Sequence, residues 1–206
     1  MDKPTIRRKE REKEARREAI LDAAAQVFSR KNFHEATLDE IASEAELAKG
    51  TLYNYYKDKQ DIFASLIIRG HRDFQERLSL EIERDGTLQT ILVRILDMAL
   101  QIMLDHKYMF RMMLSAGEHL SENFRTEMMI QWQEQVEADA QILVKAFDSM
   151  PEAKNLPQEE RLTGAYLILA AIWSLHHQQM LKSDQEPIKD DIDTYSRLLC
   201  RALRAE

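Results

Sequence analysis

The chain has 206 residues, a formal net charge of −7 at pH 7, 5 glycines and 4 prolines, and 44% of its residues are hydrophobic. Few turn-forming residues and many apolar ones favour long helices over a β-rich or disordered chain. The single Cys200 excludes an internal disulfide and fits a reducing cytoplasm. The charged N-terminus lacks an apolar signal region, and the longest apolar run, residues 165–175, is too short to span a bilayer. We therefore expect an all-α cytoplasmic protein with no membrane partner.

The N-terminal residues are basic although the whole chain is acidic. Residues 1–31 carry 10 Lys/Arg against 6 Asp/Glu. Two interpretations of residues 1–17 stay open: a basic arm that touches the minor groove or flanking phosphates of DNA, or a solvated helical extension supported by pairs such as Glu12 with Arg16. From Ile20 onward, apolar residues recur at helical spacing and predict a first amphipathic helix that ends near Asn32.

Residues 37–59 predict two short helices joined by a tight turn, followed by the start of a third helix. Thr37 and Glu40 have the spacing of a capping box, in which the hydroxyl and the carboxylate each accept from the other residue's backbone N–H. The next apolar residues recur at helical spacing, and Glu46 and Leu47 leave room only for a sharp turn. This arrangement is a helix-turn-helix, whose second helix can enter the major groove of DNA.

The second of these helices, predicted to be about two turns long over residues 49–56, has few residues that need burial. Its lysine, hydroxyls and amide suit contacts to phosphates and base edges. Gly50 lowers helix propensity by roughly 1 kcal/mol, unless a close approach to another backbone requires it. Asp58 then predicts the cap of the third helix, with Asp61 as its third-position carboxylate. Lys57 and Lys59 would therefore lie at a helix N-terminus, a natural phosphate site.

The run A-x-L-A-K-G-T-L-Y-x-Y-Y-K-D-K-x-x-x-F, preceded by T-L-D-E-I-A, resembles the recognition segment of TetR/AcrR-family transcriptional regulators. The resemblance covers about residues 17–66. It implies a DNA-binding domain at residues 1–60, with the motif at about 37–57, and a larger helical ligand-binding and dimerisation domain at residues 61–206. The residues that the resemblance places on DNA, mostly at phosphates, together with the lysine before the Asp58 cap, are Thr37, Lys49, Gly50, Thr51, Tyr53, Asn54, Tyr56, Lys57 and Lys59.

Two positions depart from the family pattern. The family usually has glycine where Glu46 stands, and a left-handed residue there would be mildly strained. It usually has serine or threonine where Ala48 stands, so the second helix lacks a side-chain cap worth about 1 kcal/mol. The phosphate contact that such a serine often makes is missing as well.

Beyond the motif, the apolar spacing predicts a long helix from about residue 59, a break at residues 85–87, and five further helical segments. We expect these near residues 87–105, 108–114, 121–147, 158–181 and 187–205, which gives about nine helices in all. Methionines are concentrated between residues 98 and 129, and flexible thioethers suit either a pocket for varied apolar ligands or ordinary core filling. With the resemblance, the predicted pocket residues are Met98, Ile102, Met109, Met113, Met129, Trp132 and Tyr166.

The last two helices look like the pair that forms a dimer interface in the family, although a helix buried within one chain would have a similar composition. The predicted interface residues are Leu169, Ile172, Trp173, His176, Leu198 and Leu199. Adjacent His176 and His177 diverge by about 100° on a helix, so they are poor joint metal ligands. We find no metal site, cofactor motif or catalytic arrangement in the sequence, and therefore expect no enzyme.

The sequence thus predicts a homodimeric regulator, most simply a repressor, that binds a double-stranded operator with an inverted repeat and is released by a small hydrophobic effector. A helical carrier or protein-binding module that does not bind DNA is the alternative. Steeply salt-dependent retention on DNA would distinguish the two.

Overall fold

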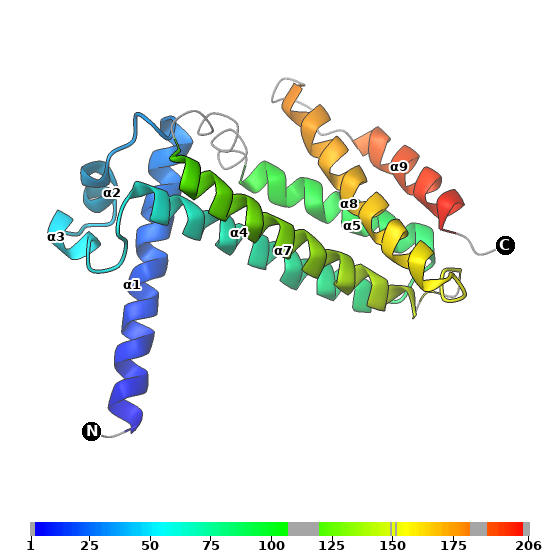
Figure 1. The fold of residues 1–206 in the computed structure, drawn as a ribbon, viewed down its shortest axis with the longest axis horizontal. Helices are drawn as coiled ribbons and strands as arrows, with labels where there is room; N and C mark the ends of the chain where they lie inside the picture. Colours follow the sequence, from blue (N-terminus) through cyan, green and yellow to red (C-terminus); the bar gives the residue numbers. More distant parts are fainter. Residues whose placement is uncertain (1–2, 107–119, 149, 151, 182–188, 204–206) are drawn as a thin grey trace. The chain divides into compact units, whose positions relative to one another are not determined.

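A computed structural model describes residues 3–106, 120–148, 150, 152–181 and 189–203. These residues form helices and no strand, as expected from the sequence (Figure 1). The helices are α1 (Lys3–Arg30), α2 (Leu38–Glu44), α3 (Lys49–Leu52), α4 (Lys59–Glu83), α5 (Leu88–Asp105), α7 (Glu122–Phe147), α8 (Gln158–Leu181) and α9 (Lys189–Ala202). The helix predicted at residues 108–114 lies outside the described residues. None of the described helices has the length and apolarity needed to cross a bilayer.

The chain divides into two compact units. The first comprises residues 1–70 and 106–128, and the second comprises residues 71–105 and 129–206. Helices α4 and α7 each contribute residues to both units. The functional boundary predicted at residue 60 stays a prediction, because compactness does not by itself delimit the DNA-binding part.

The core of the first unit is formed by apolar side chains from α1 to α4. Phe33, in the loop after α1, packs against Phe28 and Phe63 with ring centroids 6.0 and 5.3 Å apart. Burying one such side chain stabilises a fold by about 1.5–3 kcal/mol. Partly buried Phe124 and Met128, from the start of α7, pack against the same core. The helix-turn-helix therefore packs both against its neighbouring helices and against residues from the start of α7.

The second unit is built on α5, whose inward face is buried along its whole length, and on α8 and α9, which pack against α5 and against each other. Gly164 marks a close approach between the last two helices. A Cβ added there would lie only 2.4 Å from Cδ2 of Leu203, just beyond the end of α9. The predicted bounds of α8 are confirmed.

Two predicted helices differ in length from the structure. Helix α1 begins at Lys3 rather than near Ile20, so residues 3–17 form the helical extension that one of the two open interpretations expects. This segment is rich in Arg, Lys and Glu, which have high helix propensity. Helix α3 has four residues rather than two turns. The residues directly after it form i→i−3 hydrogen bonds, from Asn54 N to Thr51 O at 3.1 Å and from Tyr55 N to Leu52 O at 2.9 Å.

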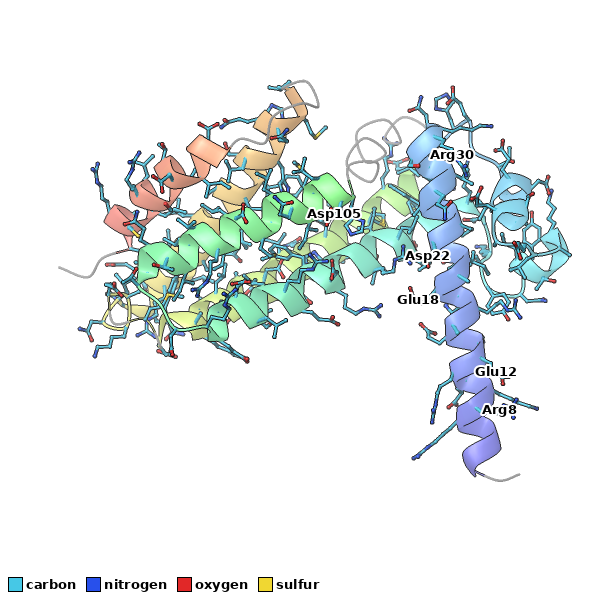
Figure 2. All side chains as sticks on the ribbon, turned by 180° about the vertical axis from the view of Figure 1, so that it is seen from behind. Arg8, Glu12, Glu18, Asp22, Arg30 and Asp105 are labelled. Atoms are coloured by element: carbon cyan, nitrogen blue, oxygen red, sulfur yellow. The ribbon has the colours of Figure 1, made fainter. Side chains whose placement is uncertain are left out.

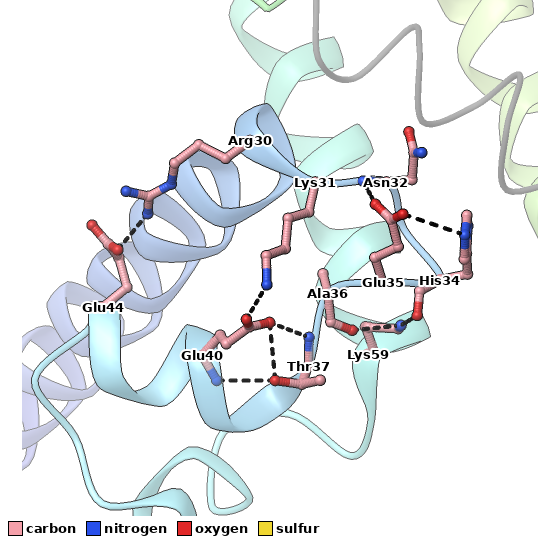
Figure 3. Close-up of polar contacts among 10 residues, drawn as sticks. All are labelled: Arg30, Lys31, Asn32, His34, Glu35, Ala36, Thr37, Glu40, Glu44 and Lys59. Carbon is pink, nitrogen blue, oxygen red and sulfur yellow. Dashed lines mark hydrogen bonds and ion pairs between the residues drawn. The ribbon is translucent and has the colours of Figure 1, made fainter.

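Lys59 joins the loop after α1 to the start of α4 (Figure 3). Its ammonium donates to the carbonyl oxygens of Phe33, His34 and Ala36, and lies 4.6 Å from the centroid of the Phe33 ring. Partial burial lowers the pKa of Lys59 from its ordinary value. The predicted cap of α4 is confirmed, since Asp61 N donates to Asp58 Oδ1 at 2.9 Å.

The turn between α2 and α3 is a Schellman motif with a glutamate in the position that favours glycine. Leu47 N donates to Ala42 O at 2.8 Å and Glu46 N donates to Ser43 O at 3.1 Å. Glu46 has φ of 54° and is the only non-glycine residue with positive φ among those described. This left-handed backbone carries the strain expected from the sequence.

We predict that Glu46→Gly raises the free energy of unfolding by up to about 1 kcal/mol, because glycine adopts positive φ without steric cost. The matched control is Ser43→Gly, at an exposed position inside α2, which should lower it by roughly 0.5 kcal/mol. Urea unfolding followed by circular dichroism measures both. An equal loss of stability in the two variants would contradict the proposed strain.

Candidate nucleic-acid interface

The helix-turn-helix begins with the predicted capping box, which the structure confirms. Glu40 N donates to Thr37 Oγ1 at 3.2 Å, and Thr37 N donates to Glu40 Oε2 at 3.0 Å (Figure 3). The same Glu40 carboxylate pairs with Lys31, and these bonds hold the pKa of Glu40 below its ordinary value. The start of α2 is therefore fixed to the end of α1.

Helix α3 begins without a side-chain cap, as expected. Ala48 is the N-cap residue, with φ −66° and ψ 140°, and its methyl group forms no hydrogen bond to the backbone of the first turn. Its carbonyl still accepts from Thr51 N at 2.8 Å. The N-terminus of this short helix thus lacks the side-chain acceptor that usually satisfies one of its N–H groups.

The exposed side of α3 and of the turn after it carries polar and cationic groups. Tyr53 is 49% exposed, and Asn54 and Lys57 are also exposed. Lys49 Nζ donates to Asp39 Oδ2 at 2.7 Å, which raises the pKa of Lys49 and keeps it protonated. Since both side chains are at least half exposed, solvent screens their attraction and the pair stabilises the fold little. The ammonium is therefore available to another anion.

Gly50 has no structural reason within its own chain to be glycine. No glycine in the described residues has positive φ. A Cβ added to Gly50 would meet no atom within 4 Å. Neither the backbone conformation nor packing within the chain therefore requires a glycine at this position. The open space at Gly50 faces away from the protein.

Two predicted contact residues use their polar groups inside the chain. Tyr56 is 1% exposed, its hydroxyl donates to Arg17 O at 3.4 Å, and burial raises the pKa of its phenol. Lys59 is bound to the three loop carbonyls described above. Thr51 is half-buried, whereas Thr37 is exposed. Contact of any of the nine residues with DNA stays a prediction.

Arg17 packs against the residues that follow α3, although the sequence analysis grouped it with the basic N-terminal residues. Its Nη1 donates to Tyr55 O at 3.2 Å, and its guanidinium lies 4.7 Å from the centroid of the Tyr56 ring. The contact joins residues nearly forty positions apart, so no local pattern indicates it. Its position one turn before buried Ile20 is the only sequence signal.

The predicted pocket residues differ in burial. Ile102 is buried and Met98 is half-buried, whereas Met129 is 71% exposed. Trp132 packs edge-on against Trp173 with ring centroids 5.1 Å apart. Tyr166 is partly exposed, and its hydroxyl donates to Glu137. Met109 and Met113 lie outside the described residues.

The predicted dimer residues fall into two groups. Leu169, Ile172 and Leu199 are buried within the chain, as the alternative interpretation of a buried helix expects. Trp173 and Leu198 are 40% and 56% exposed and could meet a second copy. His176 Nε2 lies 3.1 Å from Ala99 O, and burial lowers the pKa of its imidazole. The dimer interface stays a prediction.

The sequence reasoning missed a buried polar cluster in the second unit, formed by His71, Gln75 and Asp139. Gln75 Nε2 donates to Asp139 Oδ1 at 2.9 Å. His71 Nε2 lies 3.2 Å from the same oxygen without hydrogen-bond geometry, and finds no other acceptor among the described residues. The i, i+4 spacing of His71 and Gln75 was the available signal. No three His, Cys, Asp or Glu residues of the described ranges are grouped to hold a metal ion.

Comparison with known proteins places the motif in a family. The profile of the family described as "Bacterial regulatory proteins, tetR family" matches residues 20–66. The chain is 34% identical over 77 residues to the fatty acid metabolism regulator protein of Bacillus subtilis (strain 168), which is 37% of this chain and 40% of that protein. It is 43% identical over 79 residues to the HTH-type transcriptional repressor BepR of Brucella suis biovar 1 (strain 1330), or 38% and 37% of the two chains.

Solved structures agree over nearly the whole chain. The fatty acid degradation regulator FadR from Bacillus halodurans matches with a TM-score of 0.72 and 20% identity, covering 93% of this chain and 97% of that one. The transcriptional regulator FadR from Bacillus subtilis, solved in complex with stearoyl-CoA, matches with a TM-score of 0.66 and 20% identity, covering 90% and 98%. At such identities the likeness establishes the fold.

The matched segments span about two fifths of the length of the curated relatives named above, while the fold agrees over both units. Those relatives are regulators, which confirms the expectation that the chain is not an enzyme. The capping box, the short exposed α3 and the family match over residues 20–66 coincide. Residues 20–66 therefore belong to the TetR family of bacterial regulatory proteins, in a chain whose fold is that of TetR-family structures.

Proposed function

We propose that this chain is a ligand-responsive repressor that binds a double-stranded operator as a homodimer through α2 and α3. Gly50 carries the proposal. A glycine in a helix costs roughly 1 kcal/mol relative to alanine, and nothing within the chain requires it. Close approach by another backbone is a physical reason to keep it. The sugar–phosphate backbone of DNA fits that reason.

The groups around Gly50 suit the same partner. Lys49 and Lys57 supply cations for phosphates, while Tyr53 and Asn54 supply a hydroxyl and an amide that can bind phosphate oxygens or base edges. The Lys49–Asp39 pair is exposed, so a phosphate can replace the carboxylate at little cost. The exposed side of α3 therefore carries several kinds of hydrogen-bond donor around Gly50, where no side chain covers the backbone.

A homodimer would present two such motifs. The proposed interface uses α8 and α9, where Trp173, Leu198, Leu181 and Leu167 are exposed and apolar. A two-fold dimer buries the same patch on both copies. It would bind an inverted repeat with half-sites about one helical turn, or ~34–36 Å, apart.

The proposed effector is small and lipophilic. Two relatives support this class: one is named for fatty acid metabolism, and one was solved with stearoyl-CoA. An effector releases the operator only by its differential affinity for the two conformations, and about 5.5 kcal/mol of difference is needed to reverse a 99:1 population. In this proposal the effector binds within the second unit, among the helices that carry Ile102 and Trp132.

We predict that Tyr53→Ala or Lys49→Ala abolishes operator binding while the dimer stays intact, because each removes exposed donors on α3 and neither side chain is part of the core. The operator is selected from a random duplex library with the wild-type protein, and gel shifts measure affinity. Size-exclusion chromatography with light scattering measures the dimer. Matched controls are Leu80→Ala and Lys145→Ala, at exposed positions outside the motif. Unchanged affinity in both α3 variants would show that the recognition helix is misassigned.

We predict that Gly50→Ala separates stability from function. It should raise the free energy of unfolding by up to about 1 kcal/mol, because helix propensity improves and the Cβ meets no atom. It should weaken operator affinity tenfold or more, since the methyl group enters the space left for the DNA backbone. Thr126→Ala, at an exposed position in α7, should change stability alone. Wild-type affinity in Gly50→Ala would remove the main support for the proposal.

We predict that native mass spectrometry of the purified protein detects a dimer carrying a co-purified lipophilic molecule. Apolar ligands that bind tightly in an enclosed site survive purification, because their release exposes apolar surface to water. Delipidation in organic solvent followed by refolding provides the ligand-free reference. A protein that carries no ligand and keeps its operator affinity in the presence of added acyl compounds would argue against this effector class.

A further inference from the structure

The N-terminal half of α1 extends beyond the core of the first unit. The first buried side chain of α1 whose burial is described is that of Ile20, and residues 7–16 are all exposed. Within this unit α1 passes α2 and α3 and continues to the N-terminus, and the side chains of Arg8 and Glu12 lie on this extension (Figures 1 and 2). At 1.5 Å per residue, residues 3–16 span about 20 Å. We call residues 3–16 the N-terminal arm.

The base of the arm is fixed next to the recognition segment. Arg17 donates to Tyr55 O at 3.2 Å and stacks over the ring of Tyr56. Tyr56 in turn donates to Arg17 O. Both tyrosines follow α3 by only a few residues, and the arm is continuous with the buried part of α1. The direction of the arm is therefore set relative to α3.

The composition of the arm indicates its partner. Residues 3–16 contain seven Lys/Arg and three Glu, and Ile6 and Ala15 are their only aliphatic residues apart from Pro4. A protein groove or a membrane surface would bind an amphipathic helix through an apolar face, and this segment has none. Arg8 pairs with Glu12 at 2.8 Å, but their side chains are 81% and 61% exposed, so this pair stabilises the helix little. A polyanion is the partner that fits this charge.

The helical form of the arm decides how it can meet DNA. An α-helix is about 10–12 Å across with its side chains, whereas the minor groove is only about 6 Å wide. The arm therefore fits along the phosphate backbone and not inside the minor groove. Its length matches about six base pairs at ~3.4 Å per phosphate along one strand.

We propose that the N-terminal arm is a second DNA-binding surface, which contacts backbone phosphates beside the major groove occupied by α3 and adds no base recognition. The proposal rests on the proposed function of the α2–α3 motif. The arm would extend the DNA footprint of each protomer and raise the salt dependence of binding. Arg17 acts differently: it is a positioning residue, because it ties the arm to the segment after α3.

The test replaces Arg7, Lys9, Arg11, Lys13 and Arg16 with Gln, which removes five charges and keeps high helix propensity. The control replaces Arg72, Arg77, Lys145, Lys154 and Arg201 with Gln. It has the same net charge as the arm variant, but all of its changes lie in the second unit. Circular dichroism checks helix content. Operator affinity is measured against salt concentration by fluorescence anisotropy, on duplexes that either include or lack DNA flanking the two half-sites.

We expect the arm variant to lose affinity tenfold or more on the long duplex. Its slope of log K against log salt should fall by about two or more, since each phosphate contact contributes about 0.9. The control should keep the wild-type slope, and wild type on the short duplex should behave like the arm variant. Wild-type slope and affinity in the arm variant would overturn the arm proposal alone. Absence of salt-dependent DNA binding in the wild-type protein would overturn both proposals.

Discussion

The recognition segment depends on the burial of two side chains, Leu52 and Tyr56, against α1 and α4. Helix α3 has only four residues, and a helix of that length is not stable alone in water, because nucleation fixes several residues for one hydrogen bond. Leu52 and Tyr56 are 0% and 1% exposed. Their burial holds the segment in place and leaves Lys49, Gly50 and Tyr53 exposed.

The same core tolerates local strain in the turn before α3. Glu46 takes a left-handed backbone conformation and Ala48 provides no side-chain cap; together these cost on the order of 2 kcal/mol. The burial of Phe28, Phe33 and Phe63 contributes several times that amount. Lys59 adds a further link, because it satisfies the carbonyls of the loop after α1. The turn keeps its shape through tertiary contacts despite unfavourable local residues.

The second unit combines an apolar bundle with a polar cluster around the buried Asp139. Asp139 is 3% exposed and accepts from Gln75, while His71 approaches the same oxygen. A buried carboxylate is costly unless it is hydrogen-bonded or paired. The cluster therefore constrains how α4 and α7 pack within this unit. Trp132 packs beside it, in edge-on contact with His71 at 6.0 Å.

The sequence alone determined what depends on neighbouring residues: the capping box at Thr37, the cap at Asp58, the bounds of α8, the strained turn and the family resemblance. Helix periodicity and capping are local, so spacing reveals them. Only the tertiary structure decided which side chains of the motif turn inward. Tyr56 and Lys59 are predicted contact residues whose polar groups also bind inside the chain, to Arg17 and to loop carbonyls more than twenty positions away. The His71–Gln75–Asp139 cluster escaped the sequence for the same physical reason, since burial is set by distant elements that local patterns do not contain.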